Sequence, residues 1–317
     1  MSEMGKNRNE RVKERREFLR TGFFNACADN RLRGFLEERA YGHAGCYYQY
    51  TGVSALCGMI DSGVIHLSRA RELNDLNEIE RPHVGMWDRV YIASFSYRKR
   101  ESMAMWGLYC DPFADAVRLH FPLPALRTIL GNAGERGVIP LEWDQGEGMW
   151  RETGKPLPVK SARMTDVVYK TKNTLQWKSY SFPLSKNERL RNAIRNGELL
   201  GQVKNSAWNY ENEVRLIVEL AETVRVSDCP KRIAVPYGEL LEELGVLCGP
   251  CNTASRLRTK LGDKLEQPKG KGAILEHIEE SHFKGQVHIQ SRCKNCDFGK
   301  PKGRSQCPVH QMWPFVE

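Results

Sequence analysis

The pattern of apolar and polar positions along the chain predicts short strands interspersed with helices. Strand-like segments lie at 46–52, 64–70, 89–96, 115–123, 166–171 and 232–237. Apolar residues at helical spacing run over 53–63, where Gly63 ends the helix, and over 101–110 and 187–204. Because strands and helices do not alternate strictly, the pattern predicts an α+β fold.

The same pattern divides the chain into three parts. Residues 1–40 carry mixed charge at helical spacing and predict a basic helical extension. A core over 41–266 follows, and its end contains a strand, a Gly-Pro turn and a helix capped at Asn252 or Thr253. From Gln267 the stretch "QPKGKG" is typical of a linker, which leads into a small terminal module over 267–317.

The stretch "WNYENEVRLIVEL" over 208–220 places three charged residues at every second position. In a strand Glu211, Glu213 and Arg215 share one face. Two interpretations are open: a half-exposed strand with a solvated, self-paired polar face, or a carboxylate pair held at the mouth of a cleft.

Composition and charge change this picture only modestly. The apolar fraction of 40% is ordinary for a soluble globular protein, and neither a membrane span nor a signal-peptide core is expected, which favours a cytoplasmic location. The net charge is +9, and ten Lys/Arg against three Asp/Glu lie over 160–204. This basic stretch favours a polyanionic partner such as RNA or DNA.

The terminal module contains the ligand pattern of a structural zinc site. The stretch "CKNCDFGKPKGRSQCPVH" places Cys293 and Cys296, then Cys307 and His310, at two-residue spacing on either side of a loop. Four such ligands fill a tetrahedral Zn²⁺ site and leave no open position for catalysis. Cys248 and Cys251 have the same spacing, so a second metal site is conceivable, but Cys248 closes an apolar strand and Cys251 opens a helix, which disfavours them as ligands.

Several segments of residues 47–262 resemble, in order and spacing, an uncharacterised bacterial domain-of-unknown-function family. These are Tyr50-Thr51, "IHLS" ending at Ser68, "ELND" at 72–75, "SFS" at 94–96, "MWGLY" at 105–109, "WNYENEVRL" at 208–216 and "CGP" at 248–250. Ser94 stands where that family usually has Cys, and Leu73 where it has Phe.

That family in turn looks like a distant relative of the ADP-ribosyltransferases. The resemblance implies a split β-sheet core with flanking helices and NAD as the substrate. It implies that Glu213 stabilises the ribosyl cation formed from NAD, that Glu211 orients the acceptor group, and that Ser68 lies beneath the ribose. The NAD-binding residues that it implies are Gln49, Tyr50, Thr51, Asn74 and Asp75.

Two functions are therefore expected from the sequence. The first is an NAD-dependent ADP-ribosyltransferase that modifies nucleic acid or protein, as a toxin or phage-defence effector, with an antidote protein as a candidate partner. The second is a zinc-containing nucleic-acid-binding protein whose transferase-like core is inactive. Gln49 favours the second, because it stands where the superfamily often has His or Arg and cannot supply positive charge.

Overall fold

The computed structural model describes residues 8–43, 45–73, 87–110, 113–237, 244–265 and 278–284, and it confirms the mixed α+β class. The chain divides into two compact units, each assembled from separate segments. Unit 1 comprises Met1–Tyr47, Val64–Arg98 and Leu123–Tyr237, and unit 2 comprises Tyr48–Gly63, Lys99–Pro122 and Gly238–Glu317. The predicted core over 41–266 therefore contributes to both units. None of the helices in the described ranges is long and apolar enough to cross a membrane.

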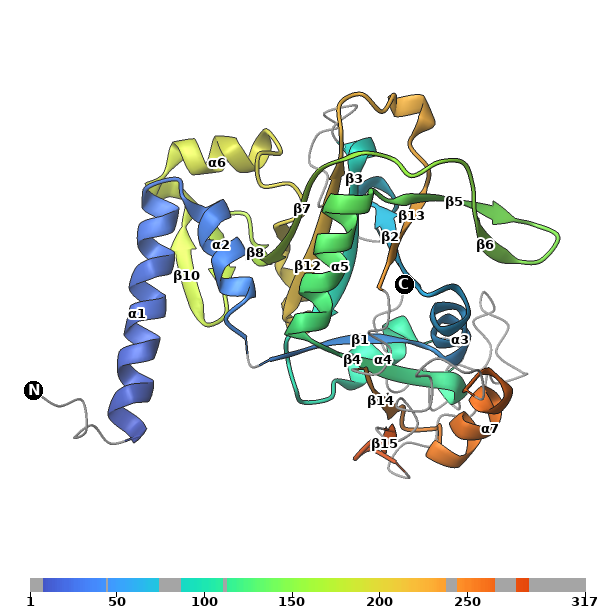
Figure 1. The fold of residues 1–317 in the computed structure, drawn as a ribbon. Helices are drawn as coiled ribbons and strands as arrows, with labels where there is room; N and C mark the ends of the chain where they lie inside the picture. The colour runs from blue at the N-terminus through green and yellow to red at the C-terminus, as the bar shows by residue number, and fades with distance from the viewer. Residues whose placement is uncertain are drawn as a thin grey trace, which may run out of the picture. The chain divides into compact units, whose positions relative to one another are not determined.

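The main sheet of unit 1 has the strand order β6-β5-β13-β2-β3-β12-β7, with every pairing antiparallel (Figure 1). Its strands are β2 (Val64–Arg69), β3 (Val90–Ser96), β5 (Ile139–Asp144), β6 (Met149–Glu152), β7 (Val159–Asp166), β12 (Glu213–Leu220) and β13 (Arg232–Pro236). Helix α5 (Leu123–Arg136) packs against β7 and β13 through its buried apolar side. Strand β12 lies between β3 and β7 and is buried along nearly its whole length.

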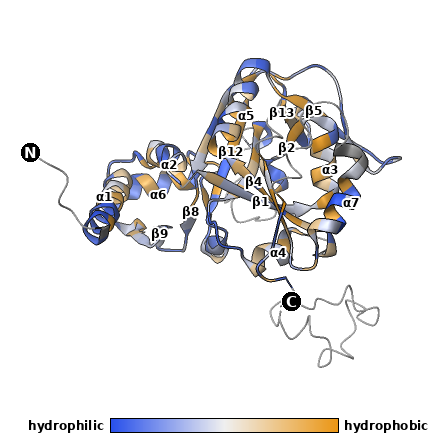
Figure 2. Cartoon of the chain, turned by 60° about the horizontal axis from the view of Figure 1, so that its bottom comes forward, coloured by the Kyte–Doolittle hydropathy of each residue, from blue (hydrophilic) through white to orange (hydrophobic). Residues whose placement is uncertain are grey.

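A second sheet of unit 1, in the order β10-β9-β8-β11, packs with three helices. Its strands are β8 (Val168–Lys170), β9 (Thr174–Trp177), β10 (Tyr180–Pro183) and β11 (Val203–Asn205), and the helices are α1 (Arg8–Ala28), α2 (Leu32–Ala40) and α6 (Glu188–Arg195). Helix α1 is hydrophilic over much of its surface (Figure 2), yet Phe23 and Cys27 are buried with Trp177 and Leu190 in one apolar cluster. The predicted extension over 1–40 thus shares its core with residues 168–199.

Unit 2 has a sheet in the order β15-β14-β4-β1. Its strands are β1 (Cys46–Gly52), which begins at the boundary with unit 1, β4 (Ala116–Pro122), β14 (Gly245–Cys248) and β15 (Ile278–Glu280), and its helices are α3 (Val53–Ser62), α4 (Met103–Tyr109) and α7 (Ala254–Leu265). The Thr253 hydroxyl accepts a hydrogen bond from the Arg256 backbone N–H, which confirms the predicted cap of α7.

Short 3₁₀ turns connect several of these segments. They are η2 (Ala70–Glu72), η4 (Trp87–Arg89), η5 (Phe113–Asp115), η6 (Leu184–Lys186), η7 (Ser206–Glu211) and η8 (Val226–Asp228). The helix predicted over 187–204 ends at Arg195, because Gly197 and Gly201 adopt positive φ angles and turn the chain into β11.

Candidate functional site

The stretch that contains the two predicted catalytic glutamates bends at its centre. Residues 206–211 form η7, and Asn212 adopts a left-handed conformation with φ 49° before β12 begins at Glu213. Glu211 therefore precedes the strand instead of lying on it, so the predicted strand over 208–220 is wrong in its first five residues. The turn nevertheless brings the two carboxylates to the same cation.

Lys204 on β11 lies between the two carboxylates. Its Nζ donates to Glu211 Oε2 at 2.6 Å and to Glu213 Oε2 at 3.2 Å. From the other side Arg215 donates from Nε to Glu213 Oε1 at 2.7 Å and from a terminal nitrogen to Oε2 at 3.2 Å. The four side chains are only 1–4% exposed. We call this set the glutamate network, and it is a buried, mutually compensated cluster where an exposed polar face or a cleft mouth was expected.

The network keeps Glu213 ionised. Burial alone raises the pKa of this carboxyl group, but the charges of Arg215 and Lys204 and the hydrogen bonds from Arg215 and Ser94 outweigh it and bring the pKa down to about 2. Ser94 is exposed, so the network approaches solvent at this residue. The Glu213 backbone N–H also donates to the Tyr169 hydroxyl at 3.0 Å, which fixes the start of β12.

Ser68, the third predicted catalytic residue, lies on the same sheet at a different level. It pairs with Ile92 on β3, whereas Glu213 pairs with Ser96 on that strand. Residues that pair across strands point to the same face of the sheet, and so do residues four apart on one strand, so Ser68 and Glu213 share a face. Four residues at about 3.3 Å each separate them by about 13 Å along β3.

The predicted NAD-binding residues fall outside unit 1's sheet or outside the described residues. Gln49, Tyr50 and Thr51 lie on β1, in the segment of this strand that belongs to unit 2, and Asn74 and Asp75 lie outside the described residues. Tyr50 is buried, with its ring edge-on to that of Trp106 at 4.7 Å and its hydroxyl accepting from the Ser102 N–H. The ring thus has a core packing role in unit 2.

The predicted zinc ligands Cys293, Cys296, Cys307 and His310 also lie outside the described residues, so this site stays a prediction. Among the described residues no group of three or more histidine, cysteine, aspartate or glutamate side chains is arranged to hold a metal ion. Cys248 is buried at the end of β14, and burial raises the pKa of its thiol to about 11.

A buried histidine–aspartate pair was not singled out from the sequence. His43 Nε2 lies 2.6 Å from Asp166 Oδ1, and Trp177 Nε1 donates to Oδ2 at 2.8 Å. The imidazole stacks on the Tyr97 ring with centroids 4.0 Å apart. Both carboxylate oxygens are thus engaged and one ring face is covered, so the cluster joins the end of α2 to β7 and β9.

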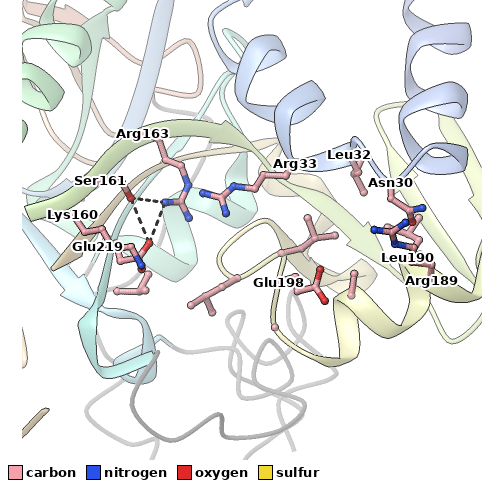
Figure 3. A pocket seen from close by; sticks show the side chains of 15 residues that line it. Asn30, Leu32, Arg33, Lys160, Ser161, Arg163, Arg189, Leu190, Glu198 and Glu219 are labelled. Atoms are coloured by element: carbon pink, nitrogen blue, oxygen red, sulfur yellow. Dashed lines mark hydrogen bonds and ion pairs between the residues drawn. The ribbon is translucent and has the colours of Figure 1, made fainter. Parts of the chain in front are cut away.

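The basic stretch over 160–204 contributes to a pocket of about 650 Å³ in unit 1 (Figure 3). Lys160, Ser161 and Arg163 come from β7, Arg189 from α6, and Arg33 from α2. The remaining lining residues are Asn30, Leu32, Val90, Leu190, Ala193, Gly197, Glu198, Leu199, Leu200 and Glu219. Four cations against two carboxylates give the lining a net charge of +2. Arg33 could not be assigned to this site from local patterns, because its proximity to residues 160–200 arises only when α2 packs against β7.

Two arginines of this pocket lie against each other despite their like charge. Burial lowers the pKa of Arg163, and the positive charge of Arg33 lowers it further. Glu37 of α2 offsets the repulsion, because its Oε1 accepts from Arg33 Nε at 3.0 Å and lies 3.3 Å from Arg163 Nε. The carboxylate of Glu37 therefore compensates both guanidinium groups at this point.

Other cations of the basic stretch are occupied elsewhere. Lys204 belongs to the glutamate network, and Lys178 is half-buried with its ammonium 4.5 Å from the Trp177 ring centroid. Burial lowers the pKa of Lys178. The positive charge available to a partner is therefore smaller than the count over 160–204 indicates, and part of it is concentrated in the pocket.

No protein-family model, curated protein or solved structure matches this chain, so the function of the pocket and of the glutamate network is inferred from their own geometry.

Proposed function

We propose that this protein binds nucleic acid through the basic pocket of unit 1. In this proposal the glutamate network has a structural role and stabilises the sheet around β12. The observation that carries the proposal is the adjacent pair Arg33 and Arg163 in a pocket that Lys160 and Arg189 also line. Guanidinium groups recognise phosphate oxygens through paired, charge-assisted hydrogen bonds, and a pocket of about 650 Å³ accommodates a nucleotide unit.

Salt dependence of binding tests this function directly. Affinity for a labelled single-stranded oligonucleotide is measured by fluorescence anisotropy over a range of salt concentrations, because each neutralised phosphate lowers the slope of log K against log salt by about 0.7. Arg189→Gln is expected to weaken binding and to make this slope shallower by roughly one contact. Arg189 is exposed on α6, so its replacement leaves the core intact.

The matched control is Arg225→Gln, since Arg225 is also an exposed arginine of unit 1 but does not line the pocket. Equal losses of oligonucleotide affinity in the two variants would show that binding depends on net charge and not on the pocket. Absence of binding by the wild type at low salt would refute nucleic-acid binding and favour a protein partner.

ADP-ribosyl transfer from NAD is the second candidate. The observation in its favour is an ionised Glu213 that hydrogen-bonds the exposed Ser94, since a preorganised negative charge is suited to stabilising the cation that forms on ribose. It ranks second because Lys204 and Arg215 already engage both oxygens of that carboxylate. Incubation with labelled NAD and a mixture of RNA, DNA and protein tests it, and no label transfer by the wild type would exclude it.

A further inference from the structure

One carboxylate oxygen of Glu37 occupies the space between the two arginines of the pocket. Glu37 Oε1 lies 3.0 Å from Arg33 Nε and 3.3 Å from Arg163 Nε, so a single negatively charged atom contacts both. Figure 3 shows the side chains of Arg33 and Arg163 extending toward one another from α2 and β7. A carboxylate of the protein, from a residue that does not itself line the pocket, thus holds together two of the arginines that do.

Glu37 satisfies these two arginines incompletely. The Nε of Arg163 is buried and makes no hydrogen bond with any described residue, because the approach of Glu37 Oε1 has the wrong angle for one. A buried N–H donor without an acceptor is unfavourable, and a ligand that supplies a well-placed oxygen removes this penalty. The Glu37 side chain is 30% exposed and lies one helical turn from Arg33, so its carboxylate can rotate away from the arginines into solvent.

Phosphate satisfies these donors better than a carboxylate. Its oxygens are tetrahedrally arranged, so one phosphate group accepts from both Nε atoms and from the terminal nitrogens of each guanidinium. Arg163 already donates to Ser161 at 3.0 Å, which orients its guanidinium toward the pocket. Lys160 lies on the same strand and is 48% exposed, and it pairs with Glu219 at 3.1 Å and Glu222 at 3.0 Å at the pocket's edge.

We propose that Glu37 is an internal substitute for a phosphate group, and that a phosphate of the bound strand displaces it and is clamped between Arg33 and Arg163. This inference rests on the proposed nucleic-acid function and adds a regulatory element to it. Glu37 competes with the ligand, so it lowers affinity while it keeps the two arginines together in the unliganded protein.

The test compares Glu37→Gln with Glu198→Gln. Glutamine keeps the shape of Glu37 but loses the charge that competes with phosphate, so Glu37→Gln is expected to bind the labelled oligonucleotide about tenfold more tightly, or more. Glu198 lines the same pocket and is exposed, and no ion pair is seen for it among the described residues. Its replacement changes net charge equally and is expected to strengthen binding only about two- to threefold.

A second probe, inorganic pyrophosphate, separates the clamp from the nucleic-acid function. The midpoint temperature of unfolding is measured with and without pyrophosphate for the wild type and both variants. The inference predicts that pyrophosphate stabilises Glu37→Gln more than either of the others. Greater stabilisation of Glu37→Gln by pyrophosphate supports the phosphate clamp even if the oligonucleotide does not bind. In that case only the proposed nucleic-acid function is refuted.

Two results overturn the clamp. If Glu37→Gln and Glu198→Gln strengthen oligonucleotide binding equally, the effect is one of net charge and nucleic-acid binding alone survives. If Glu37→Gln loses stability in urea and gains affinity for neither probe, Glu37 is a structural ion-pair partner that holds α2 against β7 and is not displaced by a ligand.

Discussion

Replacing Glu213 by glutamine removes a negative charge from a place where water cannot compensate for it. Glu213 is 2% exposed, and its partners Arg215 and Lys204 are 1% and 4% exposed. In the variant Lys204 keeps Glu211, and Arg215 keeps the Gly201 carbonyl at 3.1 Å, but the guanidinium loses the carboxylate that compensates its charge. The uncompensated positive charge of Arg215 remains buried, and it determines how much free energy of unfolding the variant loses.

The magnitude follows from the burial. Breaking a buried ion pair by removing one partner costs about 3–5 kcal/mol, a large share of a typical total stability of about 5–15 kcal/mol. At an unfolding entropy of about 2.1 cal/mol/K per residue, a chain of 317 residues would show a fall in Tm of roughly 4–8 °C. A surface pair would cost only about 0–1 kcal/mol.

The control is Glu219→Gln on the same strand. Glu219 pairs with Lys160 at 3.1 Å, but the two side chains are 26% and 48% exposed, so a loss of about 0–1 kcal/mol is expected. Urea unfolding of the wild type and both variants at neutral pH measures the difference. If Glu213→Gln unfolds within 1 kcal/mol of the wild type, the carboxylate is solvated and the buried network is refuted.

The wild type and Glu213→Gln are also expected to differ in how their stability depends on pH. The pKa of Glu213 falls from an ordinary 4.5 to about 2 in the folded chain. Its contribution is therefore complete above about pH 4.5 and is lost as the pH falls from there through 2. The wild type is expected to lose stability over this window with a steeper slope than Glu213→Gln, and parallel slopes would contradict the pKa assignment.

Three further predictions concern other parts of the chain. Metal analysis of the wild type is expected to find one zinc per chain, and a Cys293→Ser/Cys307→Ser variant to have lost it; zinc retained by the variant would exclude these ligands. Burial lowers the pKa of His120 from 6.5 to about 4, so stability is lost as the pH falls from 6.5 through 4, and His120→Gln is expected to flatten urea-unfolding stability over that range. Gly249→Ala places a Cβ 2.5 Å from the Ala116 Cβ and is expected to cost about 1–3 kcal/mol in urea unfolding, whereas Gly262→Ala on α7 meets nothing within 4 Å and should be neutral or stabilising.

Local patterns in the sequence predicted much of the fold. The strand expected at 46–52 is β1, and the helix expected at 53–63 is α3, which ends where Gly63 adopts a φ of 68°. These two predictions are correct because alternation, helical spacing and a glycine cap are all signals that lie within the segment itself. The hairpin β5–β6 was missed, since its strands are short, lie mostly outside the core and leave Trp143 exposed, so their pattern does not mark one buried face.

The candidate site was less predictable because it depends on contacts distant in sequence. A two-residue alternation placed Glu211 and Glu213 on one strand face, whereas the left-handed Asn212 separates them and Lys204 reunites them from another strand. The pocket likewise depends on Arg33, which reaches Arg163 only through tertiary packing. Neither the partner of a buried charge nor the depth of its burial can be read from local periodicity.

The apolar cluster that joins α1 to the second sheet of unit 1 has a consequence for synthesis of the chain. Phe23 and Cys27 leave the ribosome about 150 residues before their partners Trp177 and Leu190. At ordinary translation rates this interval lasts roughly 10–30 s. Throughout it α1 has only α2 to pack against, and the apolar surface that Trp177 and Leu190 later cover stays exposed to solvent.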